Sequence, residues 1–75
     1  MTLEEFVKRF AEEFDETPEE QFTADAKFKS IEEWSSLSAL SIIAMVDEEF
    51  DKSITGADLR NSETIEDLYN LIQSK

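Results

Sequence analysis

The sequence predicts an all-α protein, a small antiparallel four-helix bundle with three main helices, one short helix and a long loop between helices one and two. Several stretches place apolar residues at the i, i+3, i+4, i+7 spacing of one helix face. Glycine and proline occur once each among 75 residues, so little interrupts these patterns. A chain of this length can bury one small core only, and we expect a single domain over residues 1–75.

The first helix is expected over residues 3–15. Thr2 and Glu5 have the spacing of a capping box, in which each side chain binds an unpaired backbone N–H of the other residue. The apolar residues of this stretch follow one helix face: Leu3, Phe6, Val7, Phe10, Ala11 and Phe14.

A short turn and a long connection follow the first helix. A second box, Thr17 with Glu20, and Pro18 at the first helical position predict a turn that ends near Phe22. Residues 23–35 show no regular period, and a loop of this length in a small domain is usually either functional or a sign that an element has been assigned wrongly. We expect this loop to be anchored on the core by three residues spaced at three: Phe28, Ile31 and Trp34.

The second helix is expected from Ser36 to Phe50. On a helical wheel, one side forms the core face, with Ala39, Leu40, Ile42, Ile43, Val46 and Phe50. The opposite side holds Ser38, Ser41, Glu48 and Glu49, and it also carries three apolar residues, Leu37, Ala44 and Met45. A short apolar patch rimmed by acids is a candidate docking surface. The alternative is that single exposed apolar residues are ordinary.

The last third of the chain predicts a loop and two helical segments. Residues 51–61 read as a loop with a helical turn around Ala57–Arg60. A final helix begins at Thr64, with Asp67 at the capping distance, and it directs four apolar residues inward: Ile65, Leu68, Leu71 and Ile72.

The charge balance limits the classes of molecule that can bind this protein. Nineteen acidic and seven basic residues give a net charge of −12 and a pI near 4.1, which repels nucleic acid and anionic membranes and favours basic protein partners. With 40% hydrophobic residues and six Phe, disorder is not expected. The sequence has no 18-residue apolar stretch and no apolar N-terminal run behind basic residues, so we expect a cytoplasmic protein without a membrane span. We also expect a monomer.

Metal and catalytic chemistry are poorly supported. The segment from Asp51 through Gly56 resembles half of a calcium loop, but position eight is Asp58 and position twelve is Ser62, so no dedicated metal site is expected. Loose divalent binding is conceivable at a cluster of acids, Asp47, Glu48, Glu49 and Asp51. The chain has no His, no Cys and no evident base beside a serine, so we do not expect an enzyme.

Two serines stand where the second helix begins. Serine is a favoured N-cap, and capping alone explains Ser35 or Ser36. The same position suits a phosphodiester, because free N–H groups and the positive end of the helix dipole attract phosphate oxygens. Both interpretations hold together if Ser35 caps the helix and Ser36 is modified.

At this point the chain resembles the acyl carrier proteins. Ser36-Leu37 is followed by Leu40, Ile43, Val46 and the acidic run Asp47-Glu48-Glu49-Phe50, and the similarity extends over essentially the whole chain through Ile54 and Thr64-Ile65. The resemblance implies a 4′-phosphopantetheine arm on Ser36 that carries acyl groups as thioesters. It also implies that the protein is a carrier rather than an enzyme, serving a phosphopantetheinyl transferase and acyl-processing enzymes with basic patches. The expected partner-binding residues are Leu37, Ser41, Met45, Asp47, Glu48 and Asp58.

The chain departs from the family pattern at several positions. Ser35, Ser38 and Ser41 stand where the family commonly has acids, and Trp34 is not typical beside the attachment point. These changes indicate a specialised carrier with its own partners. The resemblance implies a role in fatty-acid synthesis or in a specialised lipid or secondary-metabolite pathway. Two alternatives stay open: an aminoacyl or D-alanyl carrier protein, and an acidic adaptor that carries no arm.

Overall fold

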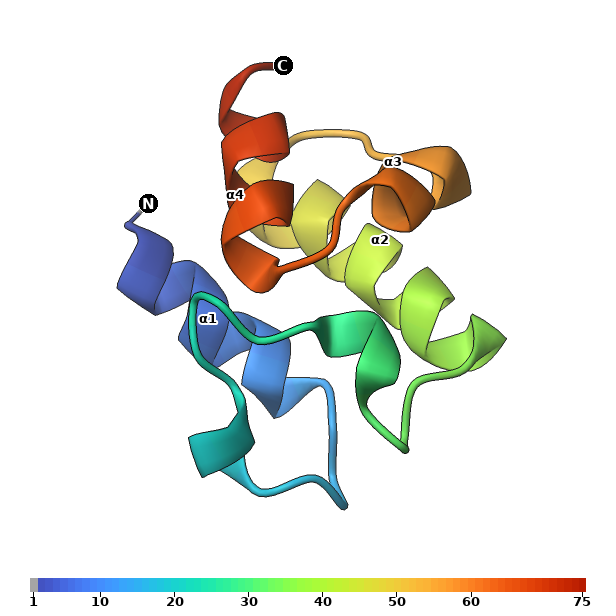
Figure 1. Ribbon diagram of the computed structural model, residues 1–75. Helices are drawn as coiled ribbons and strands as arrows, with labels where there is room; N and C mark the ends of the chain where they lie inside the picture. Colours follow the sequence, from blue (N-terminus) through green and yellow to red (C-terminus); the bar gives the residue numbers. More distant parts are fainter. Residues whose placement is uncertain (1) are drawn as a thin grey trace.

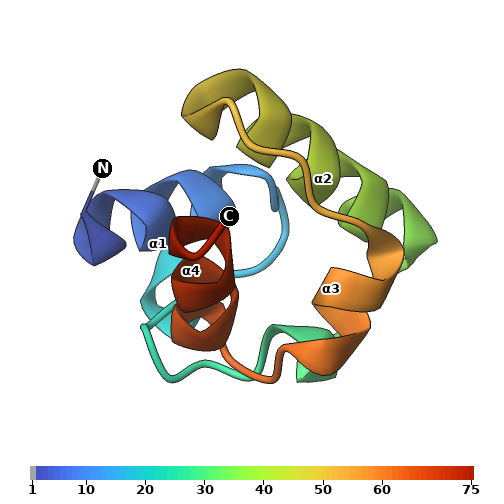
Figure 2. The same ribbon diagram turned by 90° about the horizontal axis from the view of Figure 1, so that it is seen from above.

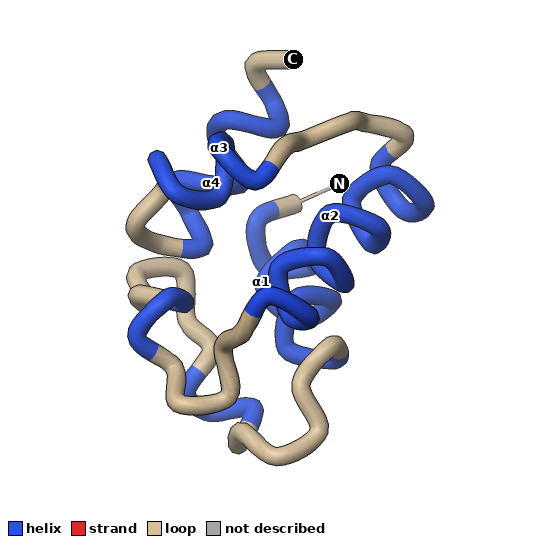
Figure 3. Tube along the Cα trace, turned by 90° about the vertical axis from the view of Figure 1, so that its right-hand side faces the viewer, coloured by secondary structure: helices blue, strands red, loops and turns tan. Residues whose placement is uncertain are grey.

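The computed structural model describes residues 2–75, and that range contains helices and no strands. Four α-helices are α1 (Leu3–Glu12), α2 (Ser36–Phe50), α3 (Gly56–Asn61) and α4 (Ile65–Gln73) (Figure 1). Two 3-10 turns, η1 (Glu19–Gln21) and η2 (Phe28–Ser30), lie in the connection between α1 and α2, most of which is loop (Figure 3). The all-helical prediction is confirmed.

The helices surround one apolar core. Figures 1 and 2 show α1 and α2 running in opposite directions, while α4 packs against α1 and α3 against α2. Aromatic rings dominate the end of the core under the long connection. The buried apolar residues are Phe6, Phe10, Ala11, Phe14, Phe22, Phe28, Ile42, Met45, Val46, Ile54, Leu59, Ile65, Leu68 and Ile72.

Capping boxes begin three of the helices. Thr2 and Glu5 cap α1, and Thr64 and Asp67 cap α4, as the sequence predicts. A further box at Thr55 begins α3. Each box satisfies two N–H groups that a helix start leaves without partners. These boxes fix where the short helices start along the chain.

The first helix ends earlier than predicted. It stops at Glu12 rather than residue 15, because the next N–H groups bond three residues back: the Glu13 N–H to the Phe10 carbonyl at 3.2 Å and the Phe14 N–H to the Ala11 carbonyl at 3.1 Å. Such bonds tighten the last turn and end the α-helix. Phe14 still continues the apolar face and is buried.

The second predicted capping box does not form. The Thr17 hydroxyl donates to the carboxylate of Glu33 at 2.7 Å instead of pairing with Glu20. The turn itself exists at η1 and ends before Phe22, but Pro18 precedes it as the cap residue, without a side-chain bond. A tertiary bond therefore replaces the local one that the sequence predicts.

The long connection is anchored as predicted. Phe28 is fully buried, and Ile31 and Trp34 pack against the core. Two backbone bonds join the connection to the start of α4: the Ile65 N–H to the Ala26 carbonyl at 3.2 Å, and the Glu66 N–H to the Ala24 carbonyl at 2.9 Å. The connection is thus a fixed part of the bundle.

The predicted rotation of α2 is wrong for two residues. Leu40, placed in the core by the wheel, is 63% exposed, whereas Met45, placed on the outer face, is only 3% exposed. The buried stripe follows Ile42, Met45 and Val46. Apolar residues occur nearly all round this helix, so its own pattern does not fix which side faces inward. Packing against the neighbouring helices decides it.

Candidate functional site

The start of α2 is built from serines with separate tasks. Ser35 adopts an extended backbone, with φ −152° and ψ −179°, and its hydroxyl accepts from the Ser38 N–H at 3.4 Å. This bond is long, at the weak end of the range for N–H···O contacts. The Ser38 hydroxyl donates to the Glu33 carbonyl at 3.2 Å. The Ser35 hydroxyl therefore caps α2, and the Ser38 hydroxyl is bonded to the segment that precedes the helix.

Ser36, the first residue of α2, is different. It is exposed, and within residues 2–75 its hydroxyl makes no hydrogen bond. It stands at the N-terminus of a 15-residue helix whose first turn contains no acidic residue. Unpaired N–H groups and the helix dipole favour an anion here. The position therefore fits a phosphodiester on the Ser36 oxygen.

Aromatic contacts hold the chain just before this helix. The indole of Trp34 stacks near Phe10 and Phe14, with ring centroids 6.5 Å and 6.2 Å apart. It also meets Phe28 edge-on at 5.0 Å. Such pairs add to the burial energy of the rings and favour one arrangement. Since Trp34 lies two residues before Ser36, the aromatic core positions the start of α2.

Glu33 is directed toward the end of α1. Its carboxylate accepts from the Thr17 hydroxyl at 2.7 Å and from the Glu16 N–H at 3.2 Å. The Thr17 bond, with smaller contributions from backbone N–H groups, holds the pKa of Glu33 below its usual value. This carboxylate joins the loop after α1 to the segment before α2.

The outer face of α2 begins with an uncharged surface beside Ser36. Leu37 and Leu40 are 75% and 63% exposed, and they are the large apolar side chains that stand open in the described part of the chain. Ser41 and Ala44 continue this strip, and both are exposed. We call Leu37, Leu40, Ser41 and Ala44 the apolar strip, since none is charged and three of the four are apolar. Leu40 was not predicted as a partner-binding residue, although its spacing of three from Leu37 places both on one helix face.

The other predicted partner-binding residues fall in three settings. Asp47 and Glu48 are exposed at the far end of α2. Met45 is in the core, so its side chain does not reach the outer face. Asp58 is half-buried and occupied: it accepts from the Thr55 N–H at 2.9 Å and pairs with the Lys75 ammonium at 3.3 Å. The Thr55 bond first, and then Lys75, lower the pKa of Asp58.

The acids near the end of α2 do not form a metal centre. No three Asp or Glu side chains in the described range come together as metal ligands. Glu49, one of the acids considered for loose divalent binding, accepts from the Arg9 guanidinium at 3.0 Å.

None of the described helices has the length and apolar character needed to cross a membrane.

Comparison with known families gives one match. The family model described as a phosphopantetheine attachment site matches residues 4–72. No curated protein and no solved structure matches the chain. The family match covers most of the sequence, including the whole of α2 and the serines at its start. The chain therefore belongs to the phosphopantetheine carrier family, as a non-catalytic protein that bears 4′-phosphopantetheine covalently and serves other enzymes.

Proposed function

We propose that residues 1–75 form one acyl carrier domain, whose arm is attached to Ser36 and presents acyl thioesters to successive enzymes. The observation that carries the attachment point is the state of the serine hydroxyls at the start of α2. The hydroxyls of Ser35 and Ser38 are engaged in hydrogen bonds, whereas Ser36 is exposed and its hydroxyl is unbonded within the described residues. A transferase must reach the hydroxyl that it esterifies, and Ser36 meets this requirement.

The side chains of this protein contribute an attachment point and an electrostatic setting. The arm supplies a terminal thiol, and the chain itself contains no Cys. The helix N-terminus stabilises an anion by about 0.3–1 kcal/mol at an exposed position. Ser35 and Ser38, which stand where the family commonly has acids, add no negative charge beside the phosphodiester. The attached phosphate therefore meets little repulsion from the first turn of α2.

Partner enzymes would dock on the outer face of α2. Leu37 and Leu40 lie next to the attachment point and suit an apolar pocket at the rim of an enzyme's active site. Asp47 and Glu48 suit basic residues farther along. At 1.5 Å per residue, Asp47 lies about 16 Å from Ser36 along the helix. Buried apolar contacts chiefly set residence time, and rim charges chiefly raise the association rate.

The attachment point is tested by mass spectrometry after co-expression with a phosphopantetheinyl transferase. The wild type should gain the mass of one arm, Ser36→Ala should gain none, and Ser35→Ala should gain it as the wild type does. Modification that persists in Ser36→Ala and disappears in Ser35→Ala would show that the serine is assigned one position too late.

The cargo is tested on protein purified from its own host. Intact mass reports the arm and the group on it together, so an acyl thioester supports the proposal. An amino acid or D-alanine on the arm would instead make the protein an aminoacyl carrier.

A further inference from the structure

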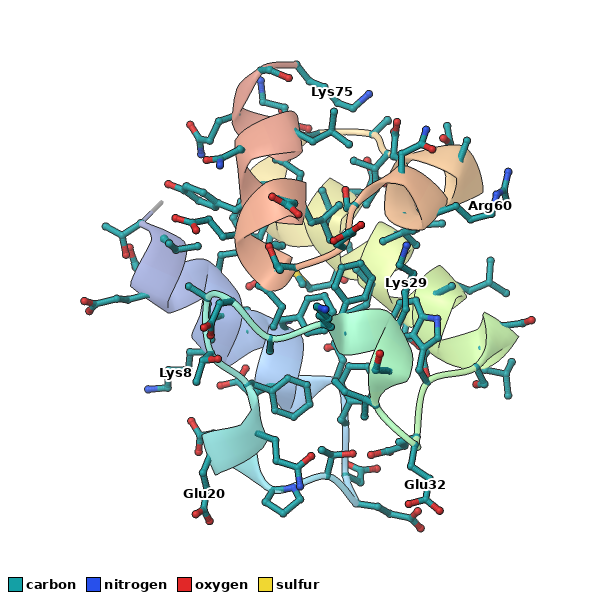
Figure 4. The ribbon with its side chains drawn as sticks, viewed as in Figure 1. Lys8, Glu20, Lys29, Glu32, Arg60 and Lys75 are labelled. Atoms are coloured by element: carbon teal, nitrogen blue, oxygen red, sulfur yellow. The ribbon has the colours of Figure 1, made fainter. Side chains whose placement is uncertain are left out.

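A group of cations stands at one corner of this acidic molecule. Lys27 directly precedes η2 and Lys29 lies within it. Arg60 lies in the last turn of α3. The Lys29 ammonium donates to the Arg60 carbonyl at 2.7 Å and lies 6.0 Å from the centroid of the Phe28 ring. Figure 4 shows Lys29 and Arg60 on the same side of the bundle. We call Lys27, Lys29 and Arg60 the basic corner.

The basic corner is not neutralised by the protein's own acids. In the described residues, no carboxylate lies within 4 Å of the charged groups of these three side chains, although the chain has nineteen acids. Glu63 shares a surface pocket with Lys27 and Lys29 without pairing with either. The ion pairs that do form use Arg9 and Lys75. The corner therefore keeps a local positive charge on a molecule of net charge −12.

The basic corner flanks the attachment point. The ring of Phe28, the residue before Lys29, lies with its centroid 5.0 Å from that of Trp34. Trp34 in turn lies two residues before Ser36. Figures 1 and 2 both show α3 on the side of the bundle where α2 begins. The acids Asp47 and Glu48 lie elsewhere, at the far end of α2, about 16 Å from Ser36 along the helix.

The transferase is the partner that must touch this flank. It acts before any arm exists, so its active site has to reach the Ser36 hydroxyl itself. A stable interface buries about 800 Å² on each protein, which corresponds to a patch of about 16 Å radius. The molecule measures 29 × 24 × 20 Å. A patch of that size around Ser36 covers a whole face of the bundle, including its edge at η2 and α3.

We propose that Lys29 and Arg60 contact carboxylates on the phosphopantetheinyl transferase and fix the orientation of the carrier on that enzyme. This inference rests on the proposed attachment at Ser36. Charges of both signs around one site disfavour wrong orientations. If the docked carrier were rotated about the apolar strip, its charges would face like charges on the enzyme. The transferase should accordingly present basic residues toward Asp47 and Glu48, and acidic residues toward the basic corner.

Charge reversal at Arg60 tests the proposal. Arg60→Glu and Lys8→Glu each change the net charge from −12 to −14, and Lys8 lies on α1, outside the proposed interface, with no carboxylate within 4 Å in the described residues. With purified apo-protein and a transferase that modifies the wild type, Arg60→Glu should raise KM about fivefold with kcat within twofold. Lys8→Glu should change KM by less than twofold. Thermal melts should show that both variants are folded.

Equal KM changes in the two variants, or a lower KM in Arg60→Glu, would overturn the proposed contact. Lys29→Gln provides a second check, since the amide keeps a donor for the Arg60 carbonyl and removes the charge; its KM should rise about twofold to threefold. Failure of the proposed function looks different. In that case Ser36→Ala would still be modified, whereas failure of the contact leaves complete, Ser36-dependent modification of every charge variant at excess transferase.

Discussion

Replacing Phe28 with Ala should remove a large part of the protein's stability. Phe28 is fully buried and meets Phe10 and Trp34 edge-on, with centroids 5.4 Å and 5.0 Å away. Truncating a buried Phe to Ala costs about 3–5 kcal/mol. At about 0.05–0.15 kcal/mol per residue, the whole free energy of unfolding of 75 residues is about 4–11 kcal/mol. The substitution therefore removes about a quarter to all of it.

Urea unfolding measures this loss, followed by far-UV circular dichroism and by the fluorescence of Trp34, the single Trp of the chain. Phe50→Ala is the matched control: Phe50 is half-buried and should cost about half as much. If Phe28→Ala is too unstable to purify, Phe28→Leu should still lower the urea midpoint. A loss below about 1 kcal/mol in Phe28→Ala would refute the reasoning that the long connection belongs to the core.

Three further predictions concern charge and capping. Raising salt or adding millimolar divalent cations should raise Tm, because screening relieves the repulsion within a chain of net charge −12, and a Tm unaffected by both would contradict this. Acidification from pH 7 to about 5 should also raise Tm, and below about pH 4 Tm should fall, as a thermal scan against pH would report. The fall follows because the pKa values of Glu33 and Asp58 are lowered in the fold: their stabilising contacts, complete above the unfolded-state pKa, are lost as pH drops through the folded-state pKa. Ser35→Ala should cost about 0.5–1 kcal/mol in urea unfolding, given the long 3.4 Å cap bond, and a loss above 2 kcal/mol would show that Ser35 does more than cap.

Much of the fold could be predicted because its signals are local. The capping boxes at Thr2 and Thr64 join residues three apart, and the helices that follow them begin where the sequence predicts. The limits of α2 also agree with prediction, from Ser36 to Phe50. Phe28 and Trp34 could be identified as anchors, since large aromatic residues in a polar loop of a small protein have only the core to pack against.

The errors arise where a distant contact outweighs a local one. Thr17 bonds to Glu33, sixteen residues away, rather than capping its own turn. The exchange of Leu40 and Met45 between surface and core depends on how α2 is rotated against its neighbours, which a helix with apolar residues on most sides does not encode. The basic corner depends on a bond between Lys29 and the Arg60 carbonyl, thirty-one residues apart. No spacing in the sequence indicates that Lys29 contacts the backbone of Arg60.

The serines in and just before α2 leave the first turn of the helix, around Ser36, without acidic side chains, and this affects which partners can dock there. Around the proposed attachment point at Ser36, the surface presents leucines and the hydroxyls of Ser35, Ser38 and Ser41 and no carboxylate in the first turn of α2. Long-range attraction to a basic enzyme then comes from the far end of α2, and recognition near Ser36 depends on apolar fit, which salt screens little. A partner selected for a carrier with acids along all of α2 would leave its basic residues unpaired against this face, and leaving a buried charge without a partner is costly. For an arm attached at Ser36, as proposed, this uncharged face should disfavour such enzymes and favour partners with an apolar rim.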